Sequence, residues 1–412
     1  MANAREMTVG FMPLFDSCIL IAAAEKGFAS DENLDLHLMR ETSWASIRDR
    51  IAVGHFQAAH MLGPMPIAAN LGLHPMAAPM ICPMALNLGG NAITVSKDLH
   101  AGMLANGHVD DLEPHGAGRA LKATIAARRA EGRPALRFAV VHFHSGHNYE
   151  LRYWLSACGI SPDSDVEIVA VPPSLMPDAL ELGRIDGYCV GEPWNTISVD
   201  RDIGRIVAVK ARIWRNSPEK VLGVSKPWAD DNRDLLDALL RACYRAAQWC
   251  GNPENIEELA GIMAAPQHLG VEGRLLLPEL TGRINPAPGV TVPVEDFLVL
   301  SRRAATFPWQ SHALWFYSQM VRWGDCRHSA ENAEIARNSY RPDIFRQALK
   351  PIFAAMPAAN LKVEGALTVE QDVGTTAGRL TLGPDGFFDG KIFDPDRLEE
   401  YIASQMPGFA TA

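Results

Sequence analysis

Segments with the pattern of strands alternate with segments with the pattern of helices, and this alternation constrains the fold more than any other feature of the chain. In the first hundred residues, the strand pattern occurs at 7–12, 34–40, 56–62 and 92–96, with helical segments between. Strands separated by helices of this length form a parallel sheet with helices on both faces. The start of the chain is therefore predicted to be an α/β unit.

Polar residues mark where the first two helices of this unit begin. Asp16 and Ser17 are expected to cap a helix that runs to Glu25. Ser43 is expected to cap the next helix, in which Trp44, Ile47 and Ile51 share one face.

A second alternating set follows a polar, glycine-containing stretch at 98–118. Its expected strands are 138–142, 166–171, 185–191 and 206–210. The run 221–228 then has the pattern of a strand that returns to the first unit. Two α/β lobes joined by two crossings place a ligand cleft between them, at the carboxyl ends of the strands.

The chain length agrees with two lobes, because 412 residues exceed what one hydrophobic core usually supports. Residues 1–97 and 219–412 are predicted to form lobe 1, and residues 98–218 lobe 2. After the returning strand the chain is expected to be mainly helical, including 233–250 and 311–323. The segments 361–373 and 387–395 alternate as strands do and are expected to form a peripheral appendage.

The charge balance restricts the possible ligands. The net charge is −10, so the chain lacks the broad positive field that holds a phosphate backbone, and we expect no direct nucleic-acid binding. An anionic ligand would have to be attracted by a local group of donors. The seven cysteines are scattered without a CxxC pair, which indicates buried thiols in a reducing compartment.

The first residues also bear on location. MANAREMTVGFMPLF has no basic segment followed by the apolar run of a signal peptide. No later stretch approaches the ~20 uninterrupted apolar residues of a membrane span. The expected location is the cytoplasm.

Three polar or aromatic segments lie where a predicted strand ends and a helix begins. They are TSWAS (42–46), HSGHNY (144–149) and GEPWN (191–195). Unpaired N–H groups and the positive end of the helix dipole make such places suitable for anions. For any one segment, capping and packing alone are the simpler explanation. Trp44 either contacts a small planar ligand or begins the apolar face of its helix.

His142, His144 and His147 form an HxHxxH group, which raises the alternative of a metal site. No further Cys, Asp or Glu stands at a recognisable ligand spacing, so we predict no metal. Hydrogen-bond donation to an anion by His147 and Asn148 is favoured, and a structural role for His142.

Other candidate residues lie at the predicted crossings. Lys220 begins the returning strand and either points into the cleft or is a solvated surface charge. Gly89 and Gly90 either let backbone approach a ligand or permit a hinge with positive φ. Glu192 has no evident catalytic partner, and neither hydrolase nor nucleotide-binding motifs occur. Binding without a cofactor is therefore favoured over catalysis.

Several of these segments together resemble the nitrate- and bicarbonate-binding family of substrate-binding proteins. The matching segments are SWASIRDR (43–50), GNAITVSKD (90–98), HNYELRYWLSACGI (147–160), VAVPPSLM (169–176), GRIDGYCVGEPWN (183–195), SPEKVLGVSKPWAD (217–230) and FPWQSHALWF (307–316). The resemblance implies a type II periplasmic-binding-protein fold. It also implies ligand contacts from Trp44 beside the oxyanion, from the charge-neutralising Lys220, and from His147 and Asn148 at a helix start. His60, Gly89, Gly90 and Glu192 complete the candidate ligand-binding residues.

The sequences of two segments resemble those of one subgroup, the cytoplasmic nitrate sensors of the NasS type. Gly89 stands where the transporter proteins have a glutamine, and GYCVGEPWN resembles the sensors. The resemblance implies a partner, a NasT-like RNA-binding antiterminator with an ANTAR domain, which is released when nitrate or nitrite binds. Two alternatives stay open: the substrate-binding component of a nitrate or bicarbonate ABC transporter, and an enzyme that uses the histidine group with a metal.

Overall fold

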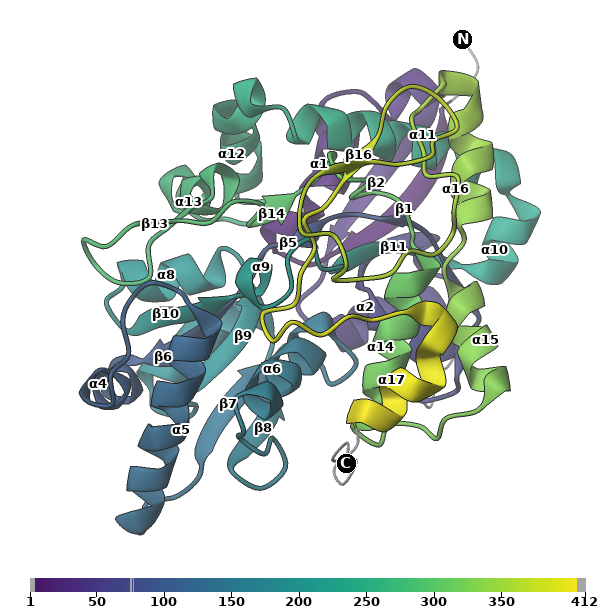
Figure 1. The fold of residues 1–412 in the computed structure, drawn as a ribbon. Coiled ribbons are helices and arrows are strands. Elements are labelled where there is room, and N and C mark those ends of the chain that lie inside the picture. Colours follow the sequence, from purple (N-terminus) through teal and green to yellow (C-terminus); the bar gives the residue numbers. More distant parts are fainter. Residues whose placement is uncertain (1–3, 75, 77, 406–412) are drawn as a thin grey trace.

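The computed structural model describes residues 4–74, 76 and 78–405, and two five-stranded sheets lie in its two halves (Figure 1). Sheet A has the order β2-β1-β3-β11-β4, with bounds β1 Arg5–Phe11, β2 Leu34–Arg40, β3 Ala58–Leu62, β4 Met80–Ala85 and β11 Lys220–Ser225. Sheet B has the order β10-β6-β9-β7-β8, with bounds β6 Asn91–Ser96, β7 Leu136–Val140, β8 Val166–Ala170, β9 Gly187–Gly191 and β10 Gly204–Val209. Short two-stranded pairs join β5 (Leu88–Gly89) to β14 (Leu298–Val299), β12 (Arg283–Ile284) to β13 (Val292–Pro293), and β15 (Gln371–Asp372) to β16 (Thr381–Leu382).

Helices cover both sheets (Figure 1). Those of the half with sheet A are α1 Cys18–Glu25, α2 Trp44–Ala52, α3 Pro64–Asn70, α10 Lys226–Asp231, α11 Arg233–Cys250, α12 Ile256–Ala264, α13 Leu277–Thr281, α14 Gln310–Arg322, α15 Ala330–Ser339, α16 Pro342–Leu349 and α17 Leu398–Gln405. Those that contact sheet B are α4 Lys97–Ala105, α5 Pro114–Ala130, α6 Gly146–Ala157, α7 Met176–Glu181, α8 Trp194–Asp200 and α9 Lys210–Ile213. Short 3-10 turns include η1 (Phe15–Ser17), which follows β1.

The parallel pairing predicted for the first unit is confirmed for β1, β2 and β3, but both sheets also contain antiparallel strands. In sheet A, β1 pairs in parallel with β2 and β3, whereas β11 is antiparallel to β3 and β4. In sheet B, β7 is parallel to β8 and β9, whereas β6 is antiparallel to β9 and β10. The chain enters β6 and β11 directly from the other half. Neither strand is therefore preceded by a helix that packs on its own sheet and returns the chain in the parallel direction.

The strand expected at 92–96 forms in the other half from the one predicted. As β6, it belongs to sheet B rather than being the fourth strand of the first unit. The first crossing therefore lies at 86–90, between β4 and β6, and not near residue 97. The stretch 98–118, expected to be a polar connection, contains most of α4 and the start of α5, because Leu99, Met103 and Ala117 give it a buried face.

Capping follows the expected chemistry at two helix starts and departs from it at a third. The Ser43 hydroxyl accepts the Ser46 N–H at 3.2 Å, and Ser145 accepts the Asn148 N–H at 3.0 Å. The prediction that Asp16 and Ser17 cap α1 is wrong, since neither side chain makes a cap hydrogen bond there. The Asp16 carboxylate instead pairs with side chains described below.

The last fifty described residues are not the peripheral appendage that was expected. Few of them are in strands. In the segment 361–373, β15 covers two residues, and the segment 387–395 forms only isolated β-bridges, to Trp214 and Glu364. Phe387 stacks on Trp214 with ring centroids 4.4 Å apart, and Phe393 is fully buried. Burial of these aromatic side chains makes this segment part of the core.

Residues 380–393, here called the strap, connect the two halves. At one end, Leu382 belongs to the hydrophobic core between sheet A and α11. At the other, the Phe388 N–H donates to the Ile213 carbonyl at 2.8 Å and Asp389 accepts the Tyr153 hydroxyl at 2.9 Å. The strap thus forms a third link beside the two crossings.

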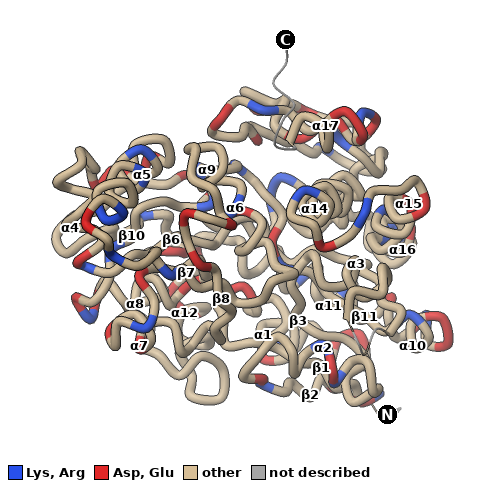
Figure 2. Tube along the Cα trace, turned by 90° about the horizontal axis from the view of Figure 1, so that it is seen from below, with Lys and Arg blue, Asp and Glu red and all other residues tan. Residues whose placement is uncertain are grey.

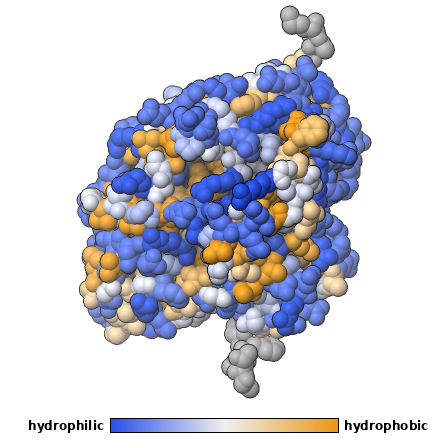
Figure 3. All heavy atoms as spheres, turned by 45° about the horizontal axis from the view of Figure 1, so that its top comes forward, coloured by the Kyte–Doolittle hydropathy of each residue, from blue (hydrophilic) through white to orange (hydrophobic). Residues whose placement is uncertain are grey.

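The surface is mixed in both charge and hydropathy. Figure 2 shows Lys and Arg interspersed with Asp and Glu along the chain, and Figure 3 shows hydrophobic residues in separate groups between hydrophilic ones. Five cysteines are buried, Cys158 and Cys326 are half-buried, and all seven are free thiols. Within the described part of the chain, no helix is both long and apolar enough to cross a membrane.

Candidate functional site

Three elements of sheet A bring ionisable side chains to one buried place. Asp16 lies in η1, directly after β1, and His60 is the polar residue of the fully buried strand β3. Lys220 is the first residue of β11. The Lys220 Nζ lies 2.7 Å from Asp16 Oδ2, and His60 Nε2 lies 2.9 Å from Asp16 Oδ1. The carboxylate therefore holds the ammonium and the imidazole together.

The second crossing and sheet B complete the group. Glu219, just before β11, places Oε1 2.7 Å from Lys220 Nζ and 3.4 Å from Nδ1 of His147, which lies in the first turn of α6. Its other oxygen pairs with Lys210, at the start of α9, and Lys210 Nζ is 2.6 Å from Glu150 Oε1. We call this set the junction cluster: Asp16, His60, His147, Glu150, Lys210, Glu219 and Lys220.

A glycine makes room for the Glu219 carboxylate. Gly146 is the first residue of α6, and a Cβ there would collide with Glu219 Oε2. A side chain at this position would separate α6 from the crossing. The close approach of a helix start to the crossing therefore depends on Gly146.

Trp44 lies beside Lys220 at the start of α2. The centre of its ring is 5.8 Å from Lys220 Nζ and 5.3 Å from the His60 ring. Its Nε1–H, although buried, has no hydrogen-bond partner among the described residues, and neither ring nitrogen of His147 has one. Buried donors without partners are costly. These two side chains thus offer donors that a bound molecule would satisfy.

The charges of the cluster are fixed by close opposite charges. Burial alone would raise the pKa of Asp16, but the Lys220 ammonium and His60 lower it overall. Burial likewise opposes ionisation of Glu219, yet His147, Lys210 and Lys220 hold its pKa well below the usual value. Burial favours the neutral amine of Lys220, and Asp16 and Glu219 outweigh it and raise its pKa. Asp16, Glu219 and Lys220 are therefore ionised at neutral pH.

For three other buried side chains, the effect of burial on the pKa outweighs that of the neighbouring groups. It raises the pKa of Glu150 to about 8, despite Lys210, and that of Glu192 to about 7. It lowers the pKa of His147 to about 3, so the ring is neutral. The cluster thus combines charges that compensate one another with neutral donors.

This arrangement has the chemistry to hold a small monovalent anion. An ammonium has three N–H donors, and those of Lys220 serve two carboxylates, which leaves one. Trp44 Nε1 and a nitrogen of neutral His147 are further donors. Donors on a charged group and on neutral rings are the usual means of stabilising an oxyanion.

Several candidate residues from the sequence are not brought into this cluster. The Asn148 amide donates to the Phe143 carbonyl at 2.8 Å and accepts from Arg152. Its side chain is thus used within and just before α6, contrary to the expected ligand contact. Glu192 accepts the Thr196 N–H at 3.0 Å at the start of α8.

Gly89 and Gly90 serve the second of the two expected alternatives, positive φ. Their φ angles are 73° and 89°, and their N–H groups donate to the carbonyls of Ser217 and Phe297. A Cβ at Gly89 would collide with the Phe297 carbonyl. The glycines therefore permit close packing of the first crossing, and their amides are not free for a ligand.

The HxHxxH group separates in the structure. His147 turns to Glu219, whereas the His142 and His144 rings lie with His74, whose centroid is 5.7 and 4.7 Å from theirs. Burial lowers the pKa of His74 and His144 to about 4 and that of His142 to about 3. The three histidines of the motif thus do not converge on one point.

Four residues of the junction cluster were missed from the sequence. Glu219 precedes Lys220, and this adjacency was the available signal. Asp16 was read as a helix cap because it stands where β1 ends and α1 begins. Nothing local in the sequence distinguishes Glu150 and Lys210 from surface residues, although both are buried in the fold.

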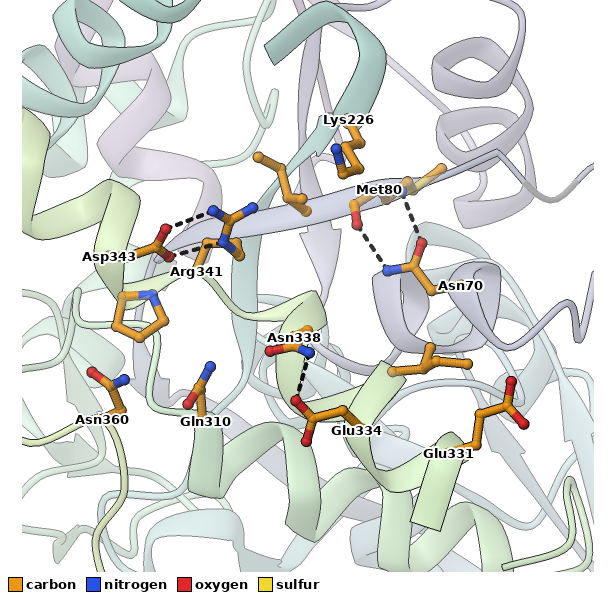
Figure 4. A pocket seen from close by; sticks show the side chains of 13 residues that line it. Asn70, Met80, Lys226, Gln310, Glu331, Glu334, Asn338, Arg341, Asp343 and Asn360 are labelled. Carbon is orange, nitrogen blue, oxygen red and sulfur yellow. Dashed lines mark hydrogen bonds and ion pairs between the residues drawn. The ribbon is translucent and has the colours of Figure 1, made fainter. Parts of the chain in front are cut away.

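A larger pocket of about 710 Å³ lies elsewhere, between α3, β4, α15 and α16 (Figure 4). Several of its polar side chains are paired with one another or with backbone: Arg341 with Asp343, Asn338 with Glu334, and Asn70 with the backbone of Met80. None of the predicted ligand-binding residues lines this pocket. Size alone therefore does not make it the better candidate.

Comparisons with known proteins agree with this fold. The sequence model described as "NMT1-like family" matches residues 1–264. The "Nitrate/nitrite binding protein NrtA" of Synechococcus elongatus is 33% identical over 97% of this chain and 86% of that protein. The "Bicarbonate-binding protein CmpA" of the same species is 27% identical over 98% and 87%. The crystal structure of the periplasmic nitrate-binding protein NrtA from Synechocystis PCC 6803 superposes with a TM-score of 0.85, at 26% identity, and covers 98% of this chain and 99% of that one. The predicted periplasmic-binding-protein fold is confirmed.

Proposed function

Because the chain belongs to the NMT1-like family, we propose that it binds a small oxyanion, nitrate or nitrite, at the junction cluster. The resemblance found in the sequence is confirmed by the relatives that span nearly the whole chain. Those relatives are named as binding proteins, and the function proposed here is likewise binding, without a cofactor.

One observation carries the proposal, the fully buried Lys220 ammonium next to unpartnered neutral donors. Lys220 has 0% exposure, and Trp44 and His147 have 1% and 0%. Trp44 comes from the half with sheet A and His147 from a helix on sheet B. An anion that these residues bind contacts both halves, so binding favours the closed arrangement of the halves over an open one.

The energies agree with a composite site. An ammonium at about 4 Å from an anion contributes about 4 kcal/mol at an effective dielectric near 20. Micromolar binding requires about 8 kcal/mol. Two or three hydrogen bonds of roughly 1.5–3 kcal/mol each supply the remainder. The donors on Trp44 and His147 match this requirement.

Isothermal titration tests the proposal. Nitrate or nitrite is expected to bind at one site per chain, and bicarbonate is titrated in parallel because a relative is named for it. The variant Lys220→Met keeps the length of the side chain and removes its charge, so it is expected to lose binding. Absence of binding to the unaltered chain, or the same affinity in the variant, would contradict the proposal.

For its biological role, we propose that the chain is a cytoplasmic nitrate sensor that controls a NasT-like antiterminator with an ANTAR domain. The resemblance of two segments, around Gly89 and at 187–195, to the sequences of such sensors supports this role. At one of them, Gly89 has positive φ and no space for a Cβ, which is consistent with a subgroup that lacks a glutamine there. A partner that prefers the open arrangement would be released when the anion closes it.

Transport is the alternative, and the names of the relatives favour it, since NrtC of Synechocystis is a "Nitrate import ATP-binding protein". A pull-down of the antiterminator with and without nitrate tests the sensor, and retention that is indifferent to nitrate excludes the switch. Fractionation of the native cells separates the two roles, because a periplasmic chain cannot meet the antiterminator.

A further inference from the structure

Two histidines and an aspartate form a second cluster, on sheet B and apart from the junction cluster. His100 lies on α4, and His108 and Asp110 lie in the connection between α4 and α5 (Figure 1). One ligand atom from each of the three lies within 4.8 Å of those of the other two. His100 is 6% exposed and His108 is 5% exposed, whereas Asp110 is half-buried. None of the three contributes to the proposed oxyanion site.

Hydrogen bonding accounts for only part of this cluster. His100 Nε2 lies 2.7 Å from Asp110 Oδ1, a normal hydrogen bond. The same oxygen lies 3.5 Å from His108 Nε2, and neither nitrogen of His108 has a hydrogen-bond partner among the described residues. A buried imidazole always carries at least one N–H or lone pair that requires a partner. His108 is therefore unexplained by the protein alone.

The arrangement matches the first shell of a metal ion. Ligand atoms about 2.0–2.1 Å from a tetrahedral ion lie roughly 3.4 Å from one another. The 3.5 Å from Asp110 Oδ1 to His108 Nε2 fits that spacing, whereas the 2.7 Å from Asp110 Oδ1 to His100 Nε2 is a hydrogen bond that a bound ion would replace. The rings are 5.5 Å apart and nearly perpendicular, at 85°, so the two do not stack against each other in a way that would block an ion.

Imidazole coordinates a metal ion in its neutral form. Two imidazoles and one carboxylate form a donor set that binds divalent transition metals such as zinc.

We propose that His100, His108 and Asp110 bind a divalent transition-metal ion, with Zn²⁺ as its representative. The ion joins α4 to the connection that leads into α5. This connection is otherwise held by Arg212, which hydrogen-bonds the Asp111 carbonyl, and by Leu112, which is buried with a φ of 62°. With three protein ligands, one position of a tetrahedral ion remains for water. None of the three residues belongs to the junction cluster, so binding of the ion is expected to be independent of nitrate.

The test is a zinc titration of the full chain after treatment with a chelator. Equilibrium dialysis with Zn²⁺ measures stoichiometry and affinity, and Co²⁺ reports the coordination geometry through its visible spectrum. The variants are His108→Ala and Asp110→Asn. Asp110→Asn keeps the shape of the side chain, so it separates loss of a ligand from failure to fold, and circular dichroism with a thermal melt checks the fold of both. His55→Ala, at an exposed histidine outside both clusters, is the matched control.

A third variant accounts for the other histidine group. His142→Ala alters the group around His74 without touching α4. The expected result is one Zn²⁺ per chain, a tetrahedral Co²⁺ spectrum, and an affinity lowered more than about tenfold in His108→Ala and in Asp110→Asn. Affinity in His55→Ala and His142→Ala is expected to be unchanged. No binding at micromolar zinc, equal affinity in Asp110→Asn, or a loss confined to His142→Ala would overturn the proposal.

Discussion

Two lysines in this molecule are each paired with two carboxylates, but they differ in exposure and in the tryptophan beside them. Lys220 pairs with Asp16 and Glu219, and Lys362 pairs with Glu364 and Asp385. Each ammonium lies near a tryptophan ring, at 5.8 Å for Lys220 and 5.9 Å for Lys362. We call the second set the strap cluster: Lys362, Glu364, Asp385, His312 and Trp309.

The difference is in how the remaining hydrogen bonds are used. In the strap cluster, Glu364 accepts the Ser311 hydroxyl at 2.6 Å, and Asp385 accepts the Leu367 N–H at 2.9 Å. The Lys362 side chain keeps 16% exposure, so water reaches it, whereas Lys220 has none. Beside the junction cluster, Trp44 Nε1 has no partner in the described part of the chain. The ring nitrogens of His312 lack partners as those of His147 do, so the contrast between the clusters rests on the exposure of the lysine and on Trp44.

The largest effect is expected from Lys220→Met. Loss of the buried charge removes about 4 kcal/mol of attraction for the anion, so the affinity for nitrate should fall by more than about 100-fold. Titration calorimetry at a temperature where the variant is folded measures it. An affinity within threefold of the unaltered chain would show that the two lysines are equivalent and that the junction cluster is structural.

Lys362→Met should reverse this pattern. Removing one partner of a buried charge pair leaves Glu364 uncompensated and should lower the free energy of unfolding by about 3 kcal/mol. Urea denaturation measures the loss, and nitrate titration of the same sample should show unchanged affinity. If nitrate affinity fell together with stability, the distinction between the clusters would be lost.

Trp44→Phe tests the unpartnered donor with little change in packing. Loss of one hydrogen bond to an anion costs about 1.5 kcal/mol or slightly more, so the affinity should fall about tenfold. The matched control is Trp309→Phe, which makes the same change beside Lys362 and should leave affinity unaltered. Equal behaviour of the two variants would argue against a ligand at Trp44.

The smallest effect is expected from pH. Glu150 has a pKa of about 8, and an anion bound at the junction cluster raises this value further. Binding therefore takes up protons, and the affinity for nitrate should increase between pH 8 and pH 6, by about tenfold at most. Nitrate itself does not titrate in this range.

Glu150→Gln, which fixes the neutral form of that side chain, should flatten this dependence. The strap cluster provides the contrast. Burial alone would raise the pKa of Glu364, but Lys362 and His312 lower it to about 2, far below this pH range. An affinity that increased with pH would contradict the assignment of neutral carboxyl groups to the site.

The sequence predicted the α/β elements well because their signals are local. The apolar runs that became β1, β2, β3, β7, β8 and β9 are short and bounded by capping residues and glycines, so they are visible in any window of the sequence. Sheet membership is different. The run at 91–96 has the pattern of a strand in either sheet, and its partners, β9 and β10, lie about a hundred residues later.

The site was predicted in part for the same reason. Trp44, His147 and Lys220 stand at element starts that the pattern reveals. Asp16 contacts Lys220 across 204 residues of sequence, and Lys210 and Glu150 meet only through the fold. Asn148 was included because it stands at a helix start, but a side chain at such a position can equally bond to the preceding loop, as it does with Phe143.

The strap changes the mechanics of any opening motion. With only the two crossings, the halves could rotate apart about a hinge axis that passes through both crossings. The stack of Phe387 on Trp214, at the base of the second crossing, adds a third contact between the halves. A rotation of the halves either has its axis through this contact or breaks it. We therefore expect the contact between Phe387 and Trp214 to affect the stiffness of this hinge. Weakening it is a way to tune how readily the molecule changes shape without altering any residue that touches the anion.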